Sequence, residues 1–314
     1  DLQSQGVQFI QDTEGNQLIP WKKINSDDVV IIPAFGTTLE TSAILEEKQI
    51  DTVTYNTTCP FVEKVWNRSS TLGETDHTVI IHGKRNHEET KATFSHSQRN
   101  SPTIIVRDIT ETEKIVNFIL GKISSDDILE TFKGRYSLGF NPNTDLKRIG
   151  VVNQTTMLAS ETQEIADCLK LAMVNKFGET ELKKHFADTR DTLCYATNDN
   201  QSATLELLKK EADLAIVVGG YNSSNTTHLV ELLEAKFSTY FINNEHEINS
   251  KDSICSFNIH EKNIENLTHF LPNQEQYKII ITSGASCPDS VVDRVMQKVM
   301  LVLGHQLSEN DIKS

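Results

Sequence analysis

The sequence predicts an α/β protein built on parallel strands, and two observations lead to that prediction. Short runs rich in Val and Ile alternate with helix-length amphipathic segments along almost the whole chain. The apolar runs show no strict alternation of polar and apolar residues, which is typical of strands in parallel sheets that are covered on both faces. Strands that alternate with helices in this way indicate βαβ units.

The apolar runs are predicted to be buried strands, and the amphipathic segments between them are predicted to be helices. The strands are expected at 28–35, 50–55, 77–83, 102–108, 148–154, 214–220, 238–244 and 277–284. The helices are expected at 111–121, 160–173, 200–210, 226–236 and 288–303. The polar stretches 122–147 and 245–276 are expected to be loops or insertions.

The composition excludes several classes of protein. The chain has 314 residues, enough for two or three domains, and a formal net charge of −14, which argues against a general nucleic-acid binder. No apolar run is long enough to cross a membrane, and no signal-peptide pattern is visible. The five cysteines are scattered, so we expect a reducing compartment such as the cytosol and no disulfide framework.

Reactive and polar residues gather where the predicted strands end. In open parallel sheets, ligands bind outside the carboxyl ends of the strands, beside helix N-termini. The segments between a predicted strand and the next helix (junctions) that are rich in such residues are "TTCPF", "IHGKRNHEET", "NQTTM", "TLCYATND", "GGYNSSNTT" and "TSGASCPD". The sequence therefore predicts one composite site built from several modules.

Two of the cysteines, Cys59 and Cys194, lie at such junctions. A free cysteine is more often a small buried apolar residue, and we keep that interpretation for Cys168 and Cys255. Cys287 also lies at a junction, and its role stays open. For Cys59, both an iron–sulfur ligand followed by proline and a nucleophile paired with a histidine remain possible from the residues alone.

The segment "HGKRNHEET" holds His82, His87, Glu88 and Glu89. A helix that begins here places its carboxylates in the first turn, where the segment can simply be a capping cluster. The functional interpretation is an anion site that uses a histidine and backbone N–H groups, beside a carboxyl group that donates a proton.

Hydroxyl and amide donors are dense in "QTTM", "NSSNTT" and "SGAS". Such runs are usually helix caps, but together they can bind a phosphate or diphosphate through neutral donors. The nucleotide-binding patterns G-x-x-x-x-G-K-[ST] and G-x-G-x-x-G are absent from the sequence, which speaks against a nucleotide cofactor.

Taken in order, these motifs resemble the LytB-type hydroxymethylbutenyl diphosphate reductases, the iron–sulfur enzymes that end the non-mevalonate isoprenoid pathway. The resemblance runs from about residue 28 to residue 300, and "PAFG" with "HGKRNHEET" is most similar to the cyanobacterial and plant branch. It is carried by "TTCPFVEKVW", "IHGKRNHEETKAT", "NQTT", "TLCYAT", "VVGGYNSSNTTHLVEL" and "ITSGASCPD".

For the fold, the resemblance implies three αβ modules with small, mostly parallel sheets arranged around a central [4Fe–4S] cluster and substrate site. The modules would comprise residues 1–57 with 282–314, residues 58–192, and residues 193–281. Three cysteines would hold the cluster, and the fourth iron would be open to the substrate. Cys59 and Cys194 match two of the three ligands.

For the chemistry, the resemblance implies that (E)-4-hydroxy-3-methylbut-2-enyl diphosphate is reduced to isopentenyl and dimethylallyl diphosphate. Glu89 would supply the proton that lets the hydroxyl group leave as water, and Thr155 would lie beside the substrate. The electrons would come from a donor such as ferredoxin or flavodoxin. The diphosphate would be held by His87, Ser223, Ser224, Asn225 and Ser286.

The sequence departs from the family pattern in three places. The family's first cluster cysteine, in a G-F-C-x-G-V element, has no match here, and neither does a substrate-side histidine that follows it. Phe35 stands where many members have histidine, and Asn200 stands where arginine is usual. We therefore expect the sequence to be truncated at its N-terminus and this chain to be poorly active, in the cytoplasm or, in a photosynthetic eukaryote, the plastid stroma.

Two other functions remain open on the residues. One is a non-catalytic protein that binds diphosphates through the same loops and holds no cluster. The other is a hydrolase or transferase that uses Cys59 and a histidine, either His82 or His87. Bound iron and sulfide would distinguish the reductase from both.

Overall fold

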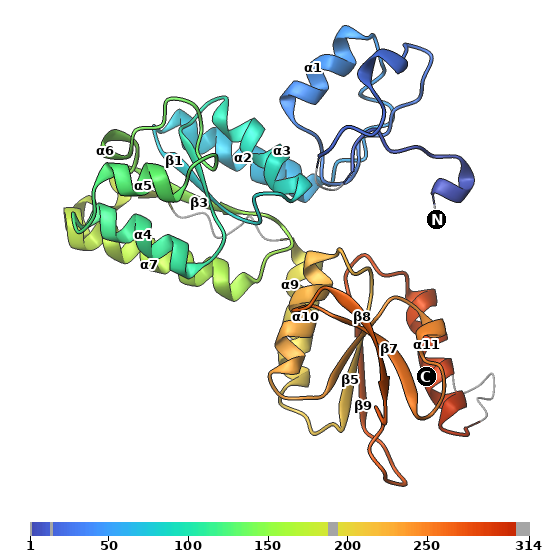
Figure 1. The fold of residues 1–314 in the computed structure, drawn as a ribbon. Helices are drawn as coiled ribbons and strands as arrows, with labels where there is room; N and C mark the ends of the chain where they lie inside the picture. Colours follow the sequence, from blue (N-terminus) through green and yellow to red (C-terminus); the bar gives the residue numbers. More distant parts are fainter. Residues whose placement is uncertain (1, 13–14, 188–193, 306–314) are drawn as a thin grey trace. The chain divides into compact units, whose positions relative to one another are not determined.

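The computed structural model describes residues 2–12, 15–187 and 194–305, and its contacts divide the chain into two compact units, residues 1–193 and 194–314. The predicted α/β class is confirmed, because each unit contains a parallel sheet flanked by helices (Figure 1). None of the described helices is both long and apolar enough to cross a membrane.

The sheet of the first unit has the strand order β2-β1-β3-β4, and all its strands are parallel. Its strands are β1 (Thr78–His82), β2 (Thr103–Val106), β3 (Ile149–Asn153) and β4 (Phe186–Ala187). The helices of this unit are α1 (Leu39–Glu47), α2 (Pro60–Glu74), α3 (Glu88–Gln98), α4 (Ile109–Ile119), α5 (Ser125–Thr131), α6 (Pro142–Asp145), α7 (Ala159–Phe177) and α8 (Leu182–His185), with short 3-10 turns at Gln3–Gln5, Trp21–Lys23 and Glu179–Glu181.

Both faces of this sheet are buried, which explains why its strands read as continuous apolar runs. On one face, Ile80 of β1 and Val151 of β3 pack against α4, α5 and α7. On the other face, Val79 and Val152 pack against α2 and α3. Figure 1 shows the two sets of helices on opposite sides of β1 and β3.

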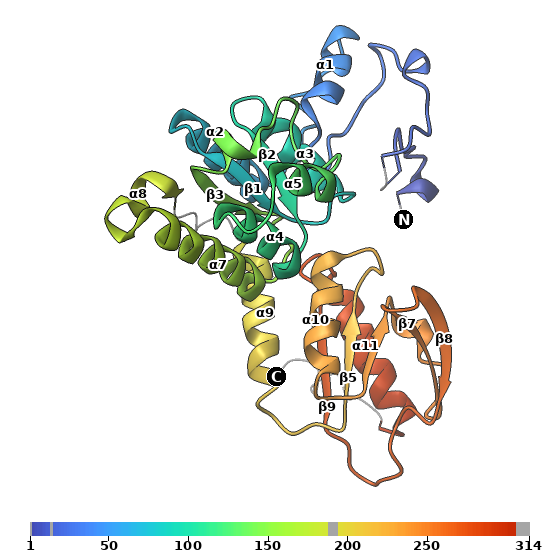
Figure 2. The same ribbon diagram turned by 60° about the vertical axis from the view of Figure 1, so that its left-hand side comes forward.

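The sheet of the second unit has the order β6-β5-β9 and is also parallel. Between β6 and β9 the chain forms an antiparallel pair, β7-β8. Alternate residues of β5 face two cores, one under α9 and α10 and one under α11. Figure 2 shows α10 and α11 next to β5. The elements are β5 (Leu214–Val218), β6 (Thr239–Ile242), β7 (Ser253–Asn258), β8 (Asn263–Thr268), β9 (Ile279–Ser283), α9 (Tyr195–Leu207), α10 (Ser224–Glu234) and α11 (Asp289–Val302), with a 3-10 turn at Glu245–Glu247.

Two predicted strands, 28–35 and 50–55, are wrong. The first run makes a single parallel bridge, between Ile32 and Asn56, the residue that follows the second run, and neither run forms a strand. A strand needs a neighbour to satisfy its backbone N–H and C=O groups, and the described residues offer these two runs only each other. Their outward side chains are accordingly exposed, with Val53 at 82% of its full accessible area.

Two regions expected to be loops contain regular structure. The stretch 122–147 forms α5, which begins with a capping box at Ser124 and Asp127, and the short helix α6. The stretch 245–276 forms the β7-β8 pair, whose outer strand β8 is mostly exposed and polar. Exposed polar strands and short capped helices carry little apolar periodicity, so the hydrophobic pattern does not reveal them.

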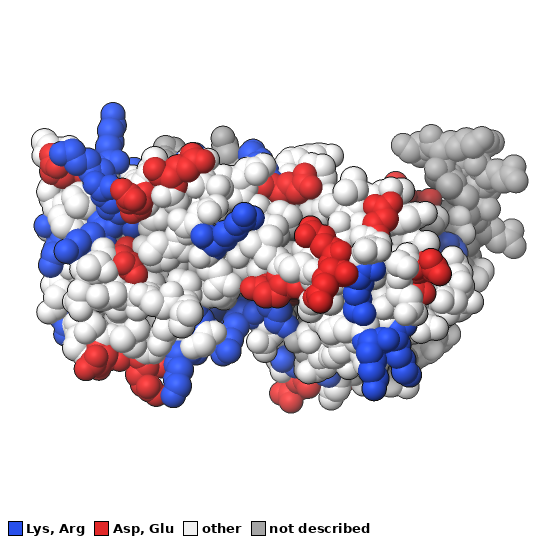
Figure 3. All heavy atoms as spheres, turned by 90° about the horizontal axis from the view of Figure 1, so that it is seen from above, with Lys and Arg blue, Asp and Glu red and all other residues white. Residues whose placement is uncertain are grey.

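The division into three modules remains a prediction. It joins residues 282–314 to residues 1–57, whereas the described residues of 282–314 pack within the second unit, where β9 pairs with β5. The predicted boundary between residues 192 and 193, the Thr192 and Leu193 of "TLCYAT", and residues 306–314 lie outside the described residues. On the face drawn in Figure 3, acidic and basic side chains of the described residues are interspersed, so the excess of carboxylates makes no single acidic patch there.

The close approach of α2 to the first sheet depends on Gly150 in β3. A Cβ atom added to Gly150 would lie 2.5 Å from Cδ2 of Leu72, which is buried on α2. We expect Gly150→Ala to lower the free energy of unfolding by roughly 1–3 kcal/mol, because the core must shift to admit the methyl group. The matched control is Gly220→Ala, where an added Cβ would meet no atom within 4 Å.

Denaturant unfolding of both variants measures the difference. A Gly150→Ala protein as stable as the Gly220→Ala protein would show that α2 can move away from the sheet at no cost.

Candidate functional site

The predicted junction residues of the first unit meet at the carboxyl edge of its sheet. β1 and β3 are adjacent, and His82 at the end of β1 is in register with Asn153 at the end of β3. The chain after β1 forms the loop that ends at His87, and the chain after β3 continues into Gln154 and Thr155. Two loops that are far apart in the sequence are therefore neighbours.

Glu89 and Thr155 are in direct contact at this edge. The backbone N–H of Thr155 donates to Oε1 of Glu89 at 2.5 Å, and its hydroxyl group donates to Oε2 at 3.0 Å. The Glu89 side chain is completely buried in the first turn of α3. Burial raises the pKa of this carboxyl group to about 7, although the two hydrogen bonds from Thr155 act in the opposite direction.

His87 caps α3 and is neutral at ordinary pH. Its Nδ1 atom accepts a hydrogen bond from the backbone N–H of Glu89 at 3.2 Å. Burial, followed by the charges of Lys84 and Lys91, lowers the pKa of His87 to about 4. Because Nδ1 is an acceptor, the ring proton of the neutral form lies on Nε2, where it can be donated to an anion. The ring of Phe35 packs edge-on against His87 with the centroids 5.1 Å apart.

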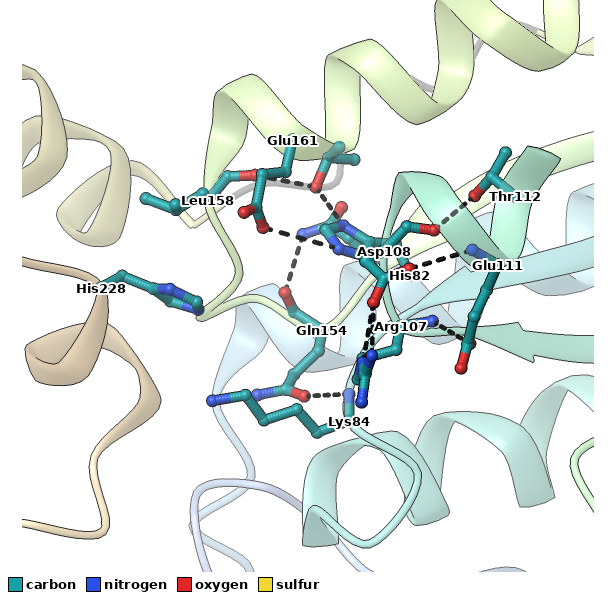
Figure 4. Close-up of polar contacts among 12 residues, drawn as sticks. His82, Lys84, Arg107, Asp108, Glu111, Thr112, Gln154, Leu158, Glu161 and His228 are labelled. Atoms are coloured by element: carbon teal, nitrogen blue, oxygen red, sulfur yellow. Dashed lines mark hydrogen bonds and ion pairs between the residues drawn. The ribbon is translucent and has the colours of Figure 1, made fainter. Parts of the chain in front are cut away.

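Gln154 joins the two loops, and no role was predicted for it from the sequence. Its Oε1 atom accepts from the backbone N–H of Lys84 at 3.1 Å and from the hydroxyl group of Thr90 at 3.0 Å. Its Nε2 atom donates to the hydroxyl group of Thr156 at 2.6 Å. Figure 4 shows Gln154 beside Lys84. Its position in "NQTTM", directly after a buried strand, was the available signal for such a role, because a buried amide group needs hydrogen-bond partners.

Cys59 lies at the N-cap of α2, with its backbone N–H bonded to the carbonyl oxygen of Ala34. The thiol caps no backbone group and is partly exposed. No hydrogen bond joins Cys59 to a histidine nitrogen among the described residues, and Nδ1 of His82 instead contacts the hydroxyl group of Thr162 at 2.8 Å. This arrangement gives no support to a nucleophile activated by His82 or His87.

In the second unit, the predicted phosphate-binding residues lie at the carboxyl ends of β5 and β9, which are adjacent. Ser223 is the N-cap of α10, and its hydroxyl oxygen accepts from the backbone N–H of Thr226. Ser224 and Asn225 follow in the first turn, and Ser286 is exposed in the loop after β9. Free backbone N–H groups and the helix dipole make such a helix end a ready anion site.

Asn225 is the most informative residue of this group. It is 3% exposed, and both polar atoms of its amide group lack a hydrogen-bond partner among the described residues. A buried amide without partners is costly, and it marks a place where a ligand or water completes the structure. Thr226 beside it is equally buried, and its hydroxyl group lies close to the backbone of Gly219 and Gly284.

Cys194 occupies the same kind of position as Cys59, at the N-cap of a helix, here α9, and it is partly exposed. Asn200 of the same helix donates to the carbonyl oxygen of Ser283 at 3.2 Å, so the residue that departs from the family pattern ties α9 to the end of β9. A partly exposed thiol can be reached by a metal ion or an iron–sulfur cluster. No group of three or more potential metal ligands is assembled among the described residues.

The other three cysteines lie away from the N-caps of α2 and α9, and the role of Cys287 stays open. Cys287 packs against the core under α11, and burial raises the pKa of its thiol. Cys168 lies within α7, and its pKa is also raised by burial. Cys255 lies in β7, where the amide group of Asn249 approaches its sulfur.

Comparison with known proteins identifies relatives along most of the chain. The family described as LytB protein matches residues 1–300. A 4-hydroxy-3-methylbut-2-enyl diphosphate reductase from Crocosphaera subtropica is 40% identical over 301 residues, which cover 95% of this chain and 72% of the relative. The enzyme of the same name from Picosynechococcus is 39% identical over 299 residues, with the same coverage of 95% and 72%.

Solved structures agree on the fold. The structure of the E-1-hydroxy-2-methyl-but-2-enyl-4-diphosphate reductase from Plasmodium falciparum superimposes with a TM-score of 0.62 at 22% identity, covering 90% of this chain and 70% of that chain. A second structure, of (E)-4-hydroxy-3-methyl-but-2-enyl diphosphate reductase, gives a TM-score of 0.50 at 22% identity and covers 92% of this chain and 81% of that chain.

The raised pKa of Glu89 predicts that the protein loses stability as the pH rises. In the unfolded chain this carboxyl group ionises near the ordinary glutamate value of 4.5, whereas in the folded chain burial keeps it protonated up to about pH 7. The stabilisation is full below pH 4.5 and is lost as the pH rises through about 7, at a total cost on the order of 3 kcal/mol. Glu89→Gln should remove this part of the pH dependence.

Denaturant unfolding at pH 5 and pH 8 measures the effect. Glu63→Gln, which changes an exposed carboxyl group on α2, is the control and should keep the wild-type slope. If Glu89→Gln also keeps the wild-type slope, the buried carboxyl group is not the source of the pH dependence.

Proposed function

This chain belongs to the LytB family, and on that premise we propose that it reduces (E)-4-hydroxy-3-methylbut-2-enyl diphosphate to isopentenyl and dimethylallyl diphosphate. The chain is an oxidoreductase of the non-mevalonate isoprenoid pathway, and its family uses an iron–sulfur cluster. The observation that carries the proposal is the buried Glu89 carboxyl group, whose pKa of about 7 suits a proton donor at neutral pH.

In the proposed reaction, the C–O bond of the allylic alcohol breaks and its hydroxyl group leaves as water. The change consumes two electrons and two protons. Glu89 delivers the proton that the hydroxyl group needs, and the second proton forms the new C–H bond on the allylic carbon skeleton. The two hydrogen bonds from Thr155 hold the carboxyl group in one orientation and stabilise the carboxylate that remains after the transfer. A general acid whose pKa lies near the working pH is both protonated often enough and acidic enough to act.

The diphosphate group is proposed to bind through neutral donors. His87 offers its Nε2 proton, since Nδ1 is already occupied as an acceptor. Asn225 offers a buried amide group with no partner among the described residues, at the N-terminus of α10. Ser223, Ser224 and Ser286 add hydroxyl groups near the same strand ends. Neutral donors and helix dipoles bind phosphate oxygens without a cluster of lysines or arginines.

Cys59 and Cys194 are proposed to be ligands of the [4Fe–4S] cluster, which supplies electrons to the substrate when it is bound. Both are partly exposed thiols at helix N-termini, and this donor chemistry fits an iron–sulfur cluster. A cluster normally needs more protein ligands than two. We therefore propose that this chain by itself holds the cluster weakly and turns over slowly. A one-electron carrier such as ferredoxin or flavodoxin is the proposed electron donor.

Glu89→Gln should lower the turnover number by at least about 100-fold, because a carboxamide cannot donate the proton. The amount of bound iron should not change, since Glu89 is not proposed to bind the cluster. The reaction is followed with the diphosphate substrate and an artificial low-potential one-electron donor under anaerobic conditions.

The matched control for this experiment is Glu88→Gln, which changes the preceding carboxyl group on α3, and it should keep most of the activity. A Glu89→Gln protein that retains more than a tenth of the wild-type turnover would rule out Glu89 as the proton donor.

The cluster ligands can be tested without measuring activity. In protein purified anaerobically, Cys59→Ser and Cys194→Ser should each remove most of the bound iron and sulfide. Cys168→Ser, which changes a thiol within α7, should leave the iron content unchanged. Equal losses of iron in Cys59→Ser and Cys168→Ser would contradict the assignment. A wild-type chain that takes up no iron even when it is reconstituted anaerobically with iron and sulfide would favour a diphosphate-binding protein without a cluster.

A further inference from the structure

A polar pocket lies in the first unit, at the carboxyl ends of β1 and β2. It has a volume of about 480 Å³. Its walls come from the loop after β1, from the end of β2 and the start of α4, and from the segment that follows α5. Five of its ten lining residues are basic and one is acidic, in a chain with 44 acidic and 30 basic residues. The basic residues are Lys84, Arg85, Arg107, Lys133 and Arg135.

Only part of this positive charge is neutralised by nearby carboxylates. Arg135 pairs with Glu111 at 2.6 Å, and Arg107 pairs with Asp108 at 2.7 Å. Arg85 and Lys133 form no side-chain hydrogen bond or ion pair within the part of the chain that the structure describes, and both are exposed. The pocket therefore keeps an excess of positive charge that an anion can neutralise.

The backbone holds Arg85 within the pocket. Gly134 has a φ of +71°, and a Cβ atom there would lie 2.8 Å from Nη2 of Arg85. The guanidinium group therefore packs directly against the backbone of the segment after α5. This segment is fixed in turn, because the backbone N–H of Ile105 in β2 donates to the carbonyl oxygen of Arg135. The two walls that carry Arg85 and Lys133 are thus held close together.

We propose that this pocket binds a small, multiply charged anion of the phosphate class, such as a diphosphate, outside the site that contains Glu89 and His87. The volume falls within the range of small-molecule sites, roughly 300–1,000 Å³, and a concave wall suits a compact ligand better than a flat protein surface. Arginine offers a planar fork of donors that matches phosphate oxygens, and lysine adds a mobile charge.

An anion in this pocket would act on the candidate active site through Lys84. The backbone N–H of Lys84 donates to Gln154, and its carbonyl oxygen accepts from the backbone N–H of His87 at 2.9 Å. Figure 4 shows the Lys84 side chain beside Gln154. Arg107, which follows β2, and Glu111 of α4 lie on the other side of the Lys84 backbone. The loop from Gly83 to Asn86 lines the pocket and also positions His87. An anion bound in the pocket would therefore affect the position of His87 as well as the loop itself.

The test is a calorimetric titration of the purified chain with inorganic pyrophosphate. The double variant Arg85→Ala/Lys133→Ala should lose one binding event, with at least a tenfold fall in affinity at that site. Binding at the candidate active site should remain, because neither residue belongs to it. Lys122→Ala is the matched control, since this exposed lysine follows the opposite end of α4 and should leave both events intact. Circular dichroism checks that the variants fold.

Two results would overturn the proposal. One is a double variant that binds pyrophosphate like the wild type and like Lys122→Ala. The other is a double variant that binds pyrophosphate normally but loses binding of polyglutamate, which would make the basic residues a docking surface for acidic proteins. A substitution that keeps the charge, Arg85→Lys/Lys133→Arg, should recover most of the affinity for pyrophosphate.

Discussion

The parallel register between β1 and β3 is the constraint on which the first unit depends. Because Ile81 lies beside Val152 and His82 beside Asn153, the loops after the two strands leave the sheet at the same point. A shift by one residue would reverse which side chains face each core and would separate Glu89 from Thr155. The buried carboxyl group, the capping histidine and the bridging glutamine all follow from this register. The pairing of the two strands thus decides which side chains meet at the candidate site, although no strand residue is proposed to touch the substrate.

The sequence predicted the elements that are buried on both sides and missed those that are not. The strands around Ile80 and Ile216 were found because a strand covered on both faces must be apolar throughout. Residues 28–35 and 50–55 also contain Val and Ile, but a strand forms only beside a pairing partner, which the sequence of the run itself does not specify. The β7-β8 pair was missed because its exposed strand is held by backbone hydrogen bonds, to which side-chain periodicity gives little clue.

The residues of the candidate site were proposed from the sequence and their roles stay predictions, whereas their burial and pKa shifts could not be predicted at all. The spacing in "HGKRNHEET" indicated a carboxyl group beside a histidine, and the family pattern selected Glu89 and His87. The raised pKa of Glu89 was beyond prediction, because it depends on complete burial beneath a loop that begins more than sixty residues later. The same holds for Asn225, whose lack of partners is a property of its surroundings. Residue types give the donors and acceptors, and tertiary packing decides how strongly each is perturbed.

The opposite shifts at His87 and Glu89 have a consequence for how the site responds to acidity. The imidazole group stays uncharged above about pH 5, because its pKa is near 4, whereas the neighbouring carboxyl group titrates near pH 7. If these two residues divide the work as proposed, the charge of His87 stays constant over a pH range in which the protonated fraction of Glu89 changes severalfold. Acidity would then act on the proton-transfer step through Glu89, and not on the charge of the histidine that is proposed to contact the diphosphate.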